Sequence, residues 1–194
     1  MPVELECKVR VESLAAPRER LRAAGAQHIA RVLEENRLFD RPDGSLRQAG
    51  CGLRVRSVRV LAGTAAKATL TFKGPRAAGV FKQREEIEVE IDDAETMGGI
   101  LRALGYAERV GFEKRRESWL LGPCRVELDE LPELGTFVEV EGPDETAIRT
   151  ALAAIGLESL PPIARGYAAM AVELLEARPG AGRALRFPPS TSAR

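Results

Sequence analysis

The chain has 194 residues, 44% of them hydrophobic, and its 29 lysine and arginine residues balance its 29 aspartate and glutamate residues. This length fits one medium domain, within the usual range of roughly 50 to 250 residues. The zero net charge excludes a broad cationic surface of the kind that binds nucleic acid or anionic membranes, so we expect neither as a partner.

The cysteines and the lack of a long apolar run favour a soluble, cytoplasmic protein. Cys7, Cys51 and Cys124 have no CxxC spacing and lie beside apolar residues, which predicts reduced, buried thiols and not a disulfide or a zinc site. The N-terminus has acidic residues within its first six positions and no apolar segment typical of a signal peptide. No apolar run approaches the roughly 18 residues needed to span a bilayer.

The first predicted strand, residues 3–11, separates charged from apolar side chains, because alternate side chains of a strand point to opposite faces. Its charged face presents Glu4, Glu6, Lys8 and Arg10. A face exposed to solvent would explain this pattern in one strand. The same separation recurs in later strands, however, and this favours a common function for the charged faces.

A short helix is predicted from Ser13, its cap, to about residue 24, with Gly25 ending it. Residues 29–40 mix β-branched and polar types and are predicted to form a strand, followed by a turn at 41–44. The next strand, at 52–56, places Arg54 and Arg56 on one face.

Two further strands extend the pattern. In residues 68–73 the polar face holds Thr69, Thr71 and Lys73, and Gly74-Pro75 ends the strand. In residues 82–91 the polar face is a row of five charged side chains, namely Lys82, Arg84, Glu86, Glu88 and Glu90. The helix that follows, at about 94–104, has the apolar spacing of a buried stripe.

The last three predicted strands lie between residues 112 and 141. Their polar faces present, in order, Lys114, Arg116 and Ser118; then Arg125, Glu127 and Asp129; then Glu139 and Glu141. Two helices follow, one ending at Gly156 and one at about 167–176. Because Pro, Gly, Ser and Arg dominate from position 178, we expect one domain over residues 1–177 and a disordered tail over 178–194.

Strands with one apolar and one ionisable face cannot bury the charged side against a core, because unpaired buried charges cost several kcal/mol each. A closed barrel resolves this problem if its apolar faces point outward under the helices and its charged faces line a water-filled bore. An open sheet with a solvated face also explains the alternation, but it gives no reason for paired cations and paired carboxylates to fall on different strands.

Cations that face each other across a bore would bind a compact polyanion, and guanidinium groups match phosphate oxygens in bidentate fashion. Carboxylates among such cations make sense if they hold a hard divalent ion, which takes oxygen ligands and bridges to phosphate. The single histidine, His28, and the lack of cysteine pairs argue against zinc and leave Mg²⁺ or Mn²⁺.

Six sequence blocks follow one another along the chain. They are ExExK at 4–8, LRVR at 53–56, LTFKGP at 70–75, REEIE at 84–88, EKRR at 113–116, and LD at 128–129 with GTFVEVE at 135–141. ExExK alone is a weak signal, but six blocks in this order and spacing resemble the CYTH superfamily of class IV adenylyl cyclases and thiamine triphosphatases, also called triphosphate tunnel metalloenzymes. The resemblance extends over about residues 3–176 and is strongest to the class IV cyclase-like branch.

This resemblance implies an α+β fold, an eight-stranded antiparallel β-barrel that forms a triphosphate tunnel with flanking α-helices, and Mg²⁺ or Mn²⁺ as cofactor. The residues it implies for triphosphate binding are Lys8, Arg54, Arg56, Lys73, Arg84, Lys114 and Arg116. Those it implies for metal binding are Glu4, Glu6, Asp129, Glu139 and Glu141. Lys114 is also a candidate for proton transfer or for balancing the charge of the leaving group.

Other charged residues receive structural assignments. Supporting ion pairs inside the bore are expected for Arg10, Lys82, Arg125, Glu88, Glu90 and Glu127. Arg165 and Tyr167 are candidates to cover one mouth of the tunnel, although a packed helix stripe explains Tyr167 equally well.

Three functions fit this chain. A triphosphatase acting on tripolyphosphate, ATP or thiamine triphosphate is favoured, because it requires only the tunnel. A class IV adenylyl cyclase would also need a site for adenine, for which the sequence offers no assignable stacking residue. A non-catalytic binder of nucleotide or polyphosphate would not require the full acidic set. The chain is expected to be a monomer or a homodimer.

Overall fold

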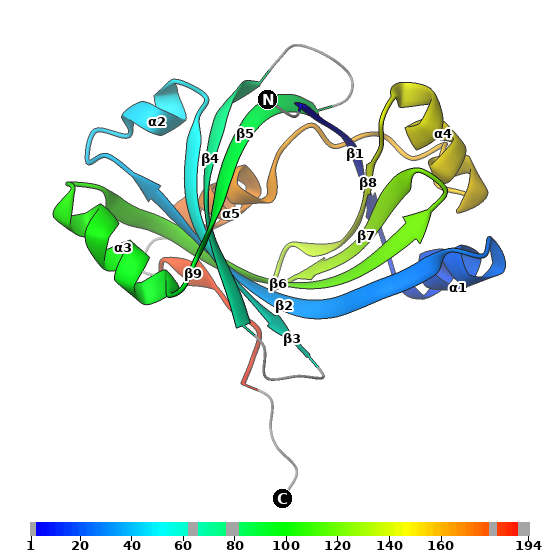
Figure 1. Ribbon diagram of the computed structural model, residues 1–194, viewed down its shortest axis with the longest axis horizontal. Helices are drawn as coiled ribbons and strands as arrows, with labels where there is room; N and C mark the ends of the chain where they lie inside the picture. Colours follow the sequence, from blue (N-terminus) through cyan, green and yellow to red (C-terminus); the bar gives the residue numbers. More distant parts are fainter. Residues whose placement is uncertain (1–2, 62–65, 77–81, 179–181, 190–194) are drawn as a thin grey trace, which may run out of the picture.

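The computed structural model describes residues 3–61, 66–76, 82–178 and 182–189, and at 3–4, 66, 76 and 82–84 it describes the backbone alone. Within these ranges the strands are β1 (Val3–Val11), β2 (Gln27–Asp40), β3 (Gly52–Val60), β4 (Ala66–Arg76), β5 (Lys82–Ile91), β6 (Ala107–Leu121), β7 (Cys124–Leu131), β8 (Gly135–Glu141) and β9 (Ala184–Leu185). The helices are α1 (Ala15–Ala23), α2 (Ser45–Gln48), α3 (Ala94–Ala103), α4 (Glu145–Ala154) and α5 (Tyr167–Glu176) (Figure 1).

The first eight strands form a closed ring of hydrogen-bonded neighbours. Their order is β2-β3-β4-β5-β1-β8-β7-β6, and β2 also pairs with β6 along most of its length. All of these pairings are antiparallel. The predicted fold class is therefore confirmed, and the alternation along each strand determines which side chains face the interior of the ring.

The largest hydrophobic core lies outside this ring, beneath α1 and α4 (Figure 1). Outward side chains such as Val126 and Val140 pack there against Leu21 of α1 and Ile148 of α4, all of them at most 1% exposed. As expected from the sequence, the apolar faces of these strands point away from the bore.

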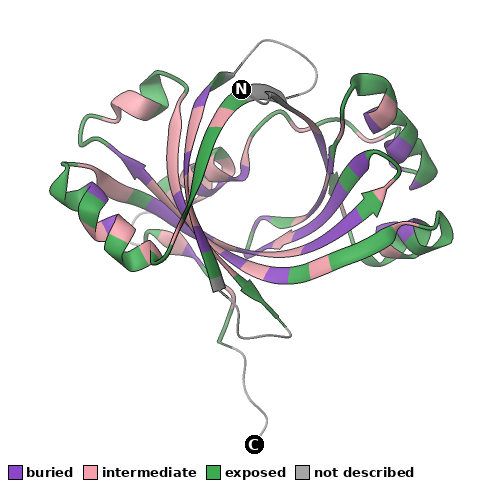
Figure 2. Cartoon of the chain, viewed as in Figure 1, coloured by how far each residue is buried: buried purple, intermediate pink, exposed green. Residues whose placement is uncertain are grey.

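The outer face of β5 differs from this expectation. Ile87 and Val89 are 49% and 55% exposed, and the exposed residues along β5 are visible in Figure 2. Among the described residues, α3 packs against the neighbouring β3 and β4 and leaves this part of β5 uncovered. The apolar side of the barrel is thus only partly covered by helices.

Within the described residues 182–189, a short strand forms where the composition predicted a disordered tail. Ala184 and Leu185 form β9, which pairs in parallel with β6, and Leu185 is 1% exposed. Leu185 packs with Phe112 and Tyr167 in the core cluster beneath α5. Burial of the apolar Leu185 stabilises this segment despite its polar composition. The prediction from the sequence considered the composition alone.

The glycines predicted to end helices do so, but one short helix was missed. Gly25 and Gly156 follow α1 and α4 with φ angles of 72° and 64°, the left-handed conformation predicted for helix ends. The short helix α2 was not predicted.

Cys7 and Cys124 are buried free thiols, whereas Cys51 is half-buried. In the part of the chain that the structure describes, no helix has the length and apolar character needed to cross a membrane.

Candidate active site

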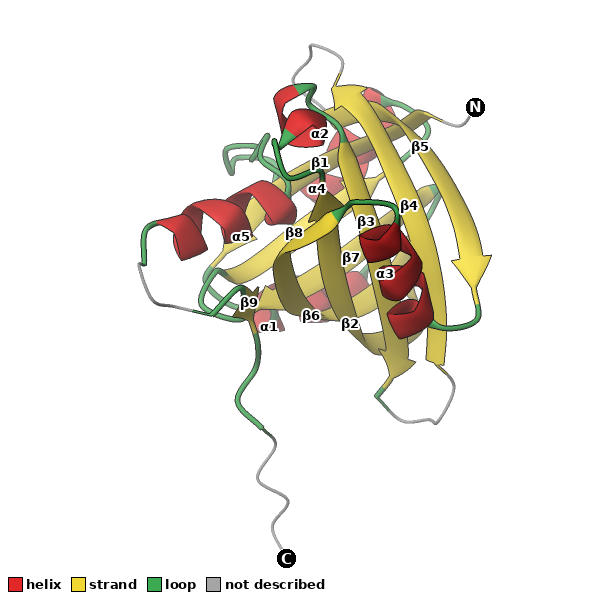
Figure 3. Ribbon diagram, turned by 90° about the vertical axis from the view of Figure 1, so that its left-hand side faces the viewer, coloured by secondary structure: helices red, strands yellow, loops and turns green. Residues whose placement is uncertain are grey.

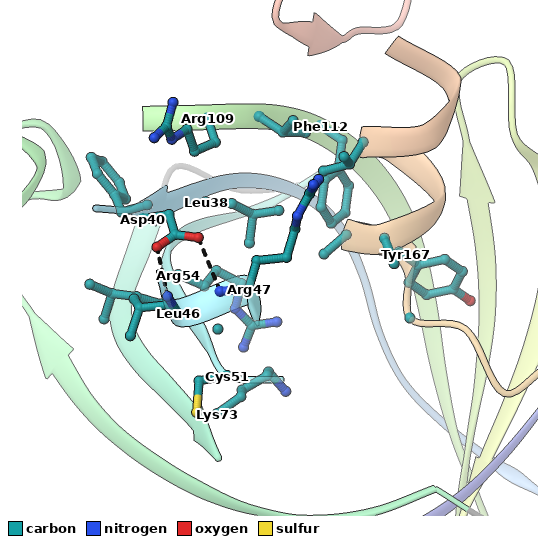
Figure 4. A pocket seen from close by; sticks show the side chains of 18 of the residues that line it. Leu38, Asp40, Leu46, Arg47, Cys51, Arg54, Lys73, Arg109, Phe112 and Tyr167 are labelled. Carbon is teal, nitrogen blue, oxygen red and sulfur yellow. Dashed lines mark hydrogen bonds between the residues drawn. The ribbon is translucent and has the colours of Figure 1, made fainter. Parts of the chain in front are cut away.

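A cavity of about 1100 Å³ occupies the interior of the ring and extends to α2 and α5 (Figure 4). The predicted cations that line it are Lys8, Arg54, Arg56, Lys73, Lys114 and Arg116. The carboxylates that line its strand walls are Glu6, Glu86, Glu88, Glu127, Glu139 and Glu141, with Asp40 at the end of β2. Cations and acids from strands far apart in the sequence therefore meet around one space.

Two predicted site residues, Glu4 and Arg84, have side chains outside the described part of the structure. Their backbones are direct partners in the pairing of β1 with β5. Lys82, expected in a supporting ion pair, is likewise described only in its backbone. The assignments of these three residues stay predictions.

Lys114 lies at the centre of a buried group of charges. Its side chain is 2% exposed, with Nζ 3.0 Å from Oε2 of Glu34 and 3.5 Å from Oδ2 of Asp129. Burial and the neighbouring Arg116 lower the pKa of Lys114, while Asp129 and Glu34 oppose this shift. Two carboxylates therefore help to keep this buried lysine charged.

Arg116 is held from two sides. Its Nε and Nη2 donate to Oδ1 and Oδ2 of Asp129 at 2.7 and 2.6 Å, and Nη2 also donates to Oε2 of Glu139 at 2.6 Å. Such bidentate, charge-assisted pairs fix the plane of a guanidinium group. Burial alone would lower the pKa of Arg116, but Asp129 and Glu34 outweigh it and raise that pKa well above its ordinary value.

Asp129, predicted as a metal ligand, lies behind the cations. It is fully buried, it accepts a hydrogen bond of 2.9 Å from the Tyr167 hydroxyl, and it does not line the cavity. Burial, with the charges of Asp129 and Glu139, raises the pKa of Tyr167 well above its usual value, so this hydroxyl keeps its proton. Nζ of Lys8 lies 4.0 Å from the centre of the Tyr167 ring.

The sequence reasoning missed two buried polar residues of β2, Glu34 and Asn36. Oε1 of Glu34 lies 3.3 Å from Nη1 of Arg56, and Nε of Arg56 donates to Oδ1 of Asn36 at 2.9 Å. Burial would raise the pKa of Glu34, but Arg56, Lys114 and Arg116 outweigh it and hold that pKa well below its usual range. The spacing of two residues that puts Glu34 and Asn36 on one face of β2 was the available signal, and the mixed composition of the segment obscured it.

Arg54 of β3 and Lys73 of β4 have acidic partners on β5. Nη2 of Arg54 donates to Oγ1 of Thr71 at 3.1 Å and lies 3.6 Å from Glu88, and Lys73 forms an ion pair with Glu86. Burial and the nearby Arg56 lower the pKa of Arg54 to about 9. The guanidinium stays charged at neutral pH. An anionic ligand would offset the cost of holding this positive charge in a buried position beside Arg56.

The residues expected to form supporting ion pairs have different surroundings. Glu127 is 5% exposed, burial raises its pKa, and its nearest cation contacts are Arg116 at 3.8 Å and Arg125 at 3.9 Å. Glu90 is exposed and pairs with Lys67 at 3.2 Å. Arg10 donates to the backbone oxygen of Leu134 and covers the Phe137 ring. Arg165 pairs with Glu173, and both line the cavity at α5.

The chemistry of the acidic side chains fits a hard divalent ion. On β1 and β8, Glu6 lies opposite Glu141, and on β7 and β8, Glu127 lies opposite Glu139, so carboxylate oxygens from three neighbouring strands face the cavity. Mg²⁺ and Mn²⁺ prefer such oxygen ligands. Among the described side chains, no three potential ligands are already gathered around one position. Metal binding would therefore require these carboxylates to rearrange or the undescribed Glu4 side chain to take part.

Comparisons with known proteins agree with this arrangement. A candidate adenylate cyclase from Methanocaldococcus jannaschii is 31% identical over 139 residues, which is 72% of this chain and 76% of that protein. A solved structure from Pyrococcus horikoshii OT3 has a TM-score of 0.76 at 26% identity and covers 90% of this chain and 99% of its own.

A candidate adenylyl cyclase from Hippeastrum, described as having a dominant triphosphatase activity, has a TM-score of 0.65 at 23% identity and covers 89% of this chain and 96% of its own. At that identity the likeness concerns the fold. The family model of the CYTH domain matches residues 3–165. The chain therefore belongs to the CYTH family.

Proposed function

We propose that this protein is a metal-dependent enzyme that hydrolyses a triphosphate bound in the barrel cavity. The observation that supports this proposal is the meeting of six predicted phosphate-binding cations with carboxylates from several strands around one cavity. The triphosphatase activity stated for the Hippeastrum neighbour points the same way. The substrate would be inorganic or organic, and the cofactor would be Mg²⁺ or Mn²⁺.

The cations would bind and orient the phosphates. Arg54, Arg56 and Lys73 line the β3–β4 wall, while Lys8, Lys114 and Arg116 line the walls from β1 and β6. Arg84 on β5 is proposed as a seventh contact. Phosphoryl transfer depends mainly on positioning and on stabilising charge on the phosphoryl oxygens, which such a set of fixed cations provides.

The divalent ion would be held by carboxylates of β1 and β8, with Glu6, Glu139 and Glu141 as ligands and Glu4 as a further one. When bound, such an ion neutralises phosphate charge and lowers the pKa of a bound water. Asp129, first assigned to the metal, is better suited to hold Arg116 and Tyr167, because it is fully buried and hydrogen-bonded to both.

In hydrolysis, the oxygen of a water molecule would attack the terminal phosphorus, and the bond from that phosphorus to the bridging oxygen would break. Phosphate and the shortened phosphate chain would leave, and the proton of the water would pass to solvent or to a nearby base. Lys114, charged and buried, would balance the negative charge that develops on the leaving group.

A second candidate is a class IV adenylyl cyclase, which the name of the M. jannaschii relative favours. The 3′-hydroxyl oxygen of ATP would attack the α-phosphorus, the bond from that phosphorus to the bridging oxygen would break, pyrophosphate would leave, and the hydroxyl proton would pass to solvent or to a nearby base. The two reactions differ in which phosphate lies beside the metal. Incubation with tripolyphosphate, ATP and thiamine triphosphate plus Mg²⁺ or Mn²⁺, scored for phosphate, pyrophosphate and cyclic AMP, distinguishes them, and no product from any substrate would indicate a non-catalytic binder.

Glu139→Gln should abolish turnover with Mg²⁺ while leaving triphosphate binding measurable, and the same is expected of Glu4→Gln. The amide is a poor metal ligand, whereas Arg116 and Lys8, which now contact Glu139, would stay available for phosphate. Phosphate release and calorimetric binding measure the two effects separately. Glu130→Gln is the matched control, because Glu130 pairs with Arg115 at a partly exposed position. Full activity of either test variant would refute the metal assignment.

The affinity for tripolyphosphate should decline on the alkaline side at a pH below 10.5, the ordinary lysine value, because the pKa of Lys114 is lowered. The protonated lysine binds the anion, so the part of the affinity due to Lys114 is constant below this lowered pKa and falls by at most about tenfold per pH unit above it. Arg54, whose pKa is about 9, adds a decline of its own that is common to the wild type and the variants, so the test is the difference between their profiles. Lys114→Arg should move the decline to higher pH, as seen in calorimetric titrations. The exposed Lys67→Arg should leave the profile unchanged, and an unshifted profile for Lys114→Arg would contradict the role of this lysine.

Glu34→Gln should lower the free energy of unfolding by roughly 3 to 5 kcal/mol near neutral pH, because it leaves buried cations without their partner. The folded-state pKa of Glu34 lies below its unfolded value, so its stabilising effect is fully present above the unfolded pKa of 4.5 and is lost only as pH falls through the lowered pKa. Urea denaturation between about pH 6 and 8 should therefore show a constant difference from the wild type. Glu35→Gln, at a partly exposed ion pair with Arg186, should cost less than about 1 kcal/mol.

A further inference from the structure

One aromatic side chain, that of Tyr167, contacts three charged groups inside the barrel. Tyr167 is the first residue of α5 and is 8% exposed. Nζ of Lys8 lies 4.0 Å from the centre of its ring, and Nζ of Lys114 lies 5.3 Å from it. Its hydroxyl group donates a hydrogen bond of 2.9 Å to Oδ2 of Asp129. Figure 4 shows Tyr167 at the start of α5. The ring and the hydroxyl group therefore contact different charged groups, two of which are cations proposed to bind phosphate.

The ring suits the two lysines because its face is electron-rich. Both ammonium groups lie within the distance of about 6 Å at which an aromatic face attracts a cation. This attraction is strongest where water is excluded, and the side chains of Lys8 and Lys114 are 1% and 2% exposed. The ring carries no net charge. It can hold two ammonium groups without repelling an incoming polyanion, as a carboxylate at the same position would.

The hydroxyl group of Tyr167 acts on the second layer of charges. Oδ2 of Asp129 accepts hydrogen bonds from this hydroxyl group and, at 2.6 Å, from Nη2 of Arg116. The same oxygen lies 3.5 Å from Nζ of Lys114. An oxygen that already accepts two short hydrogen bonds has its lone pairs occupied and attracts the lysine less strongly. The hydroxyl group thus helps to keep Lys114 available to a phosphate.

Tyr167 is itself held from several sides. The backbone N–H of Ile163 donates to the carbonyl oxygen of Lys8 at 2.7 Å, which ties the segment before α5 to β1. The Tyr167 ring meets the Phe137 ring edge to face, with 5.3 Å between their centres. Leu185 of β9 belongs to the same buried cluster, and Figure 3 shows α5 and β9 on the same side of the barrel. Tyr167 and Leu185 both lie beyond residues 3–165, the part of the chain that the family model matches.

We propose that Tyr167 is a positioning residue, whose ring fixes Lys8 and Lys114 and whose hydroxyl group fixes Asp129 in the places from which the cations bind phosphate. This inference rests on the proposed function, because it takes the two lysines as phosphate-binding groups. A divalent ion that took Glu139 as a ligand would weaken the ion pair of Glu139 with Lys8, now 3.4 Å, whereas the contact of Lys8 with the ring would remain.

The test is calorimetric binding of tripolyphosphate to the full chain in EDTA, where metal-dependent turnover does not intervene. Tyr167→Leu removes the ring and the hydroxyl group and should weaken binding by roughly tenfold, within the range of a desolvated cation–π contact. Tyr167→Phe keeps the ring and should weaken it by less than about threefold. In a Lys8→Met background, Tyr167→Leu should have less than about a threefold further effect, because the closer lysine is gone. A general structural role would instead add its full effect in both backgrounds.

A phenylalanine with three fluorine atoms on its ring, introduced at position 167, separates the charge distribution of the ring from its shape. Fluorine withdraws electrons from the ring face, so the attraction for an ammonium group weakens while the packing is nearly unchanged. This variant should bind tripolyphosphate roughly fivefold more weakly than Tyr167→Phe. It decides the question even if thermal unfolding shows that Tyr167→Leu does not fold.

Tyr106→Leu and Tyr106→Phe are the matched controls, since Tyr106 is the other tyrosine of the chain and also lies near a cation, with Arg41 5.8 Å from its ring centre. Among the described residues, Tyr106 is not one of those that line the cavity, so both changes should leave tripolyphosphate binding unaltered. No weakening in a folded Tyr167→Leu, equal affinities of the fluorinated and plain phenylalanine variants, or an undiminished effect beside Lys8→Met would overturn the inference and leave the proposed function intact. Failure of the wild type to bind tripolyphosphate would overturn both.

Discussion

The structure depends on one constraint, which is that every charge turned into the barrel must be balanced inside it. In a closed ring of pleated strands, alternate residues have no other place to point, and an unpaired charge in such a space costs several kcal/mol. The interior of this protein meets the constraint with direct contacts. Asp129 holds Arg116 by two hydrogen bonds, Glu34 and Asp129 flank Lys114, and Lys73 pairs with Glu86. The side chains proposed to bind substrate are therefore part of what stabilises the barrel.

The balancing groups fall into two layers with different consequences. Glu34, Asn36 and Asp129 are buried and do not line the cavity, so they hold the cations from behind and are in no position to contact a ligand. Glu139 and Glu86 line the cavity and contact Lys8, Arg116 and Lys73 from the front. The rear layer fixes where the cations are, and the front layer occupies positions from which a ligand or a metal ion could displace it.

Much of the fold could be predicted from the alternation of apolar and polar residues along each strand. The site residues could be predicted where charged side chains recurred at every second position. The predicted strands and the inward direction of Lys8, Arg54, Lys114 and Arg116 needed only a period of two and a closed ring. Glu34 and Asn36 were not predicted as site residues, because β2 mixes residue types on both faces. Their partners on β3 and β6 are brought next to them only when the ring forms. For the same reason the sequence could not show that Asp129 lies behind the cations, that Leu185 anchors β9, or that the cavity extends to α2 and α5.

The front layer links metal binding to phosphate binding. Glu139 now accepts from Arg116 at 2.6 Å and lies 3.4 Å from Nζ of Lys8, so its carboxylate is shared between two cations. A divalent ion that took Glu139 as a ligand would leave both cations short of negative charge, and a triphosphate would supply it. Conversely, a triphosphate entering alone would face the repulsion of Glu6, Glu139 and Glu141, which a divalent ion would neutralise. Each ligand removes the electrostatic cost of the other, so the ion and the phosphates should bind as a pair, and the mixed charges of the bore follow from that coupling.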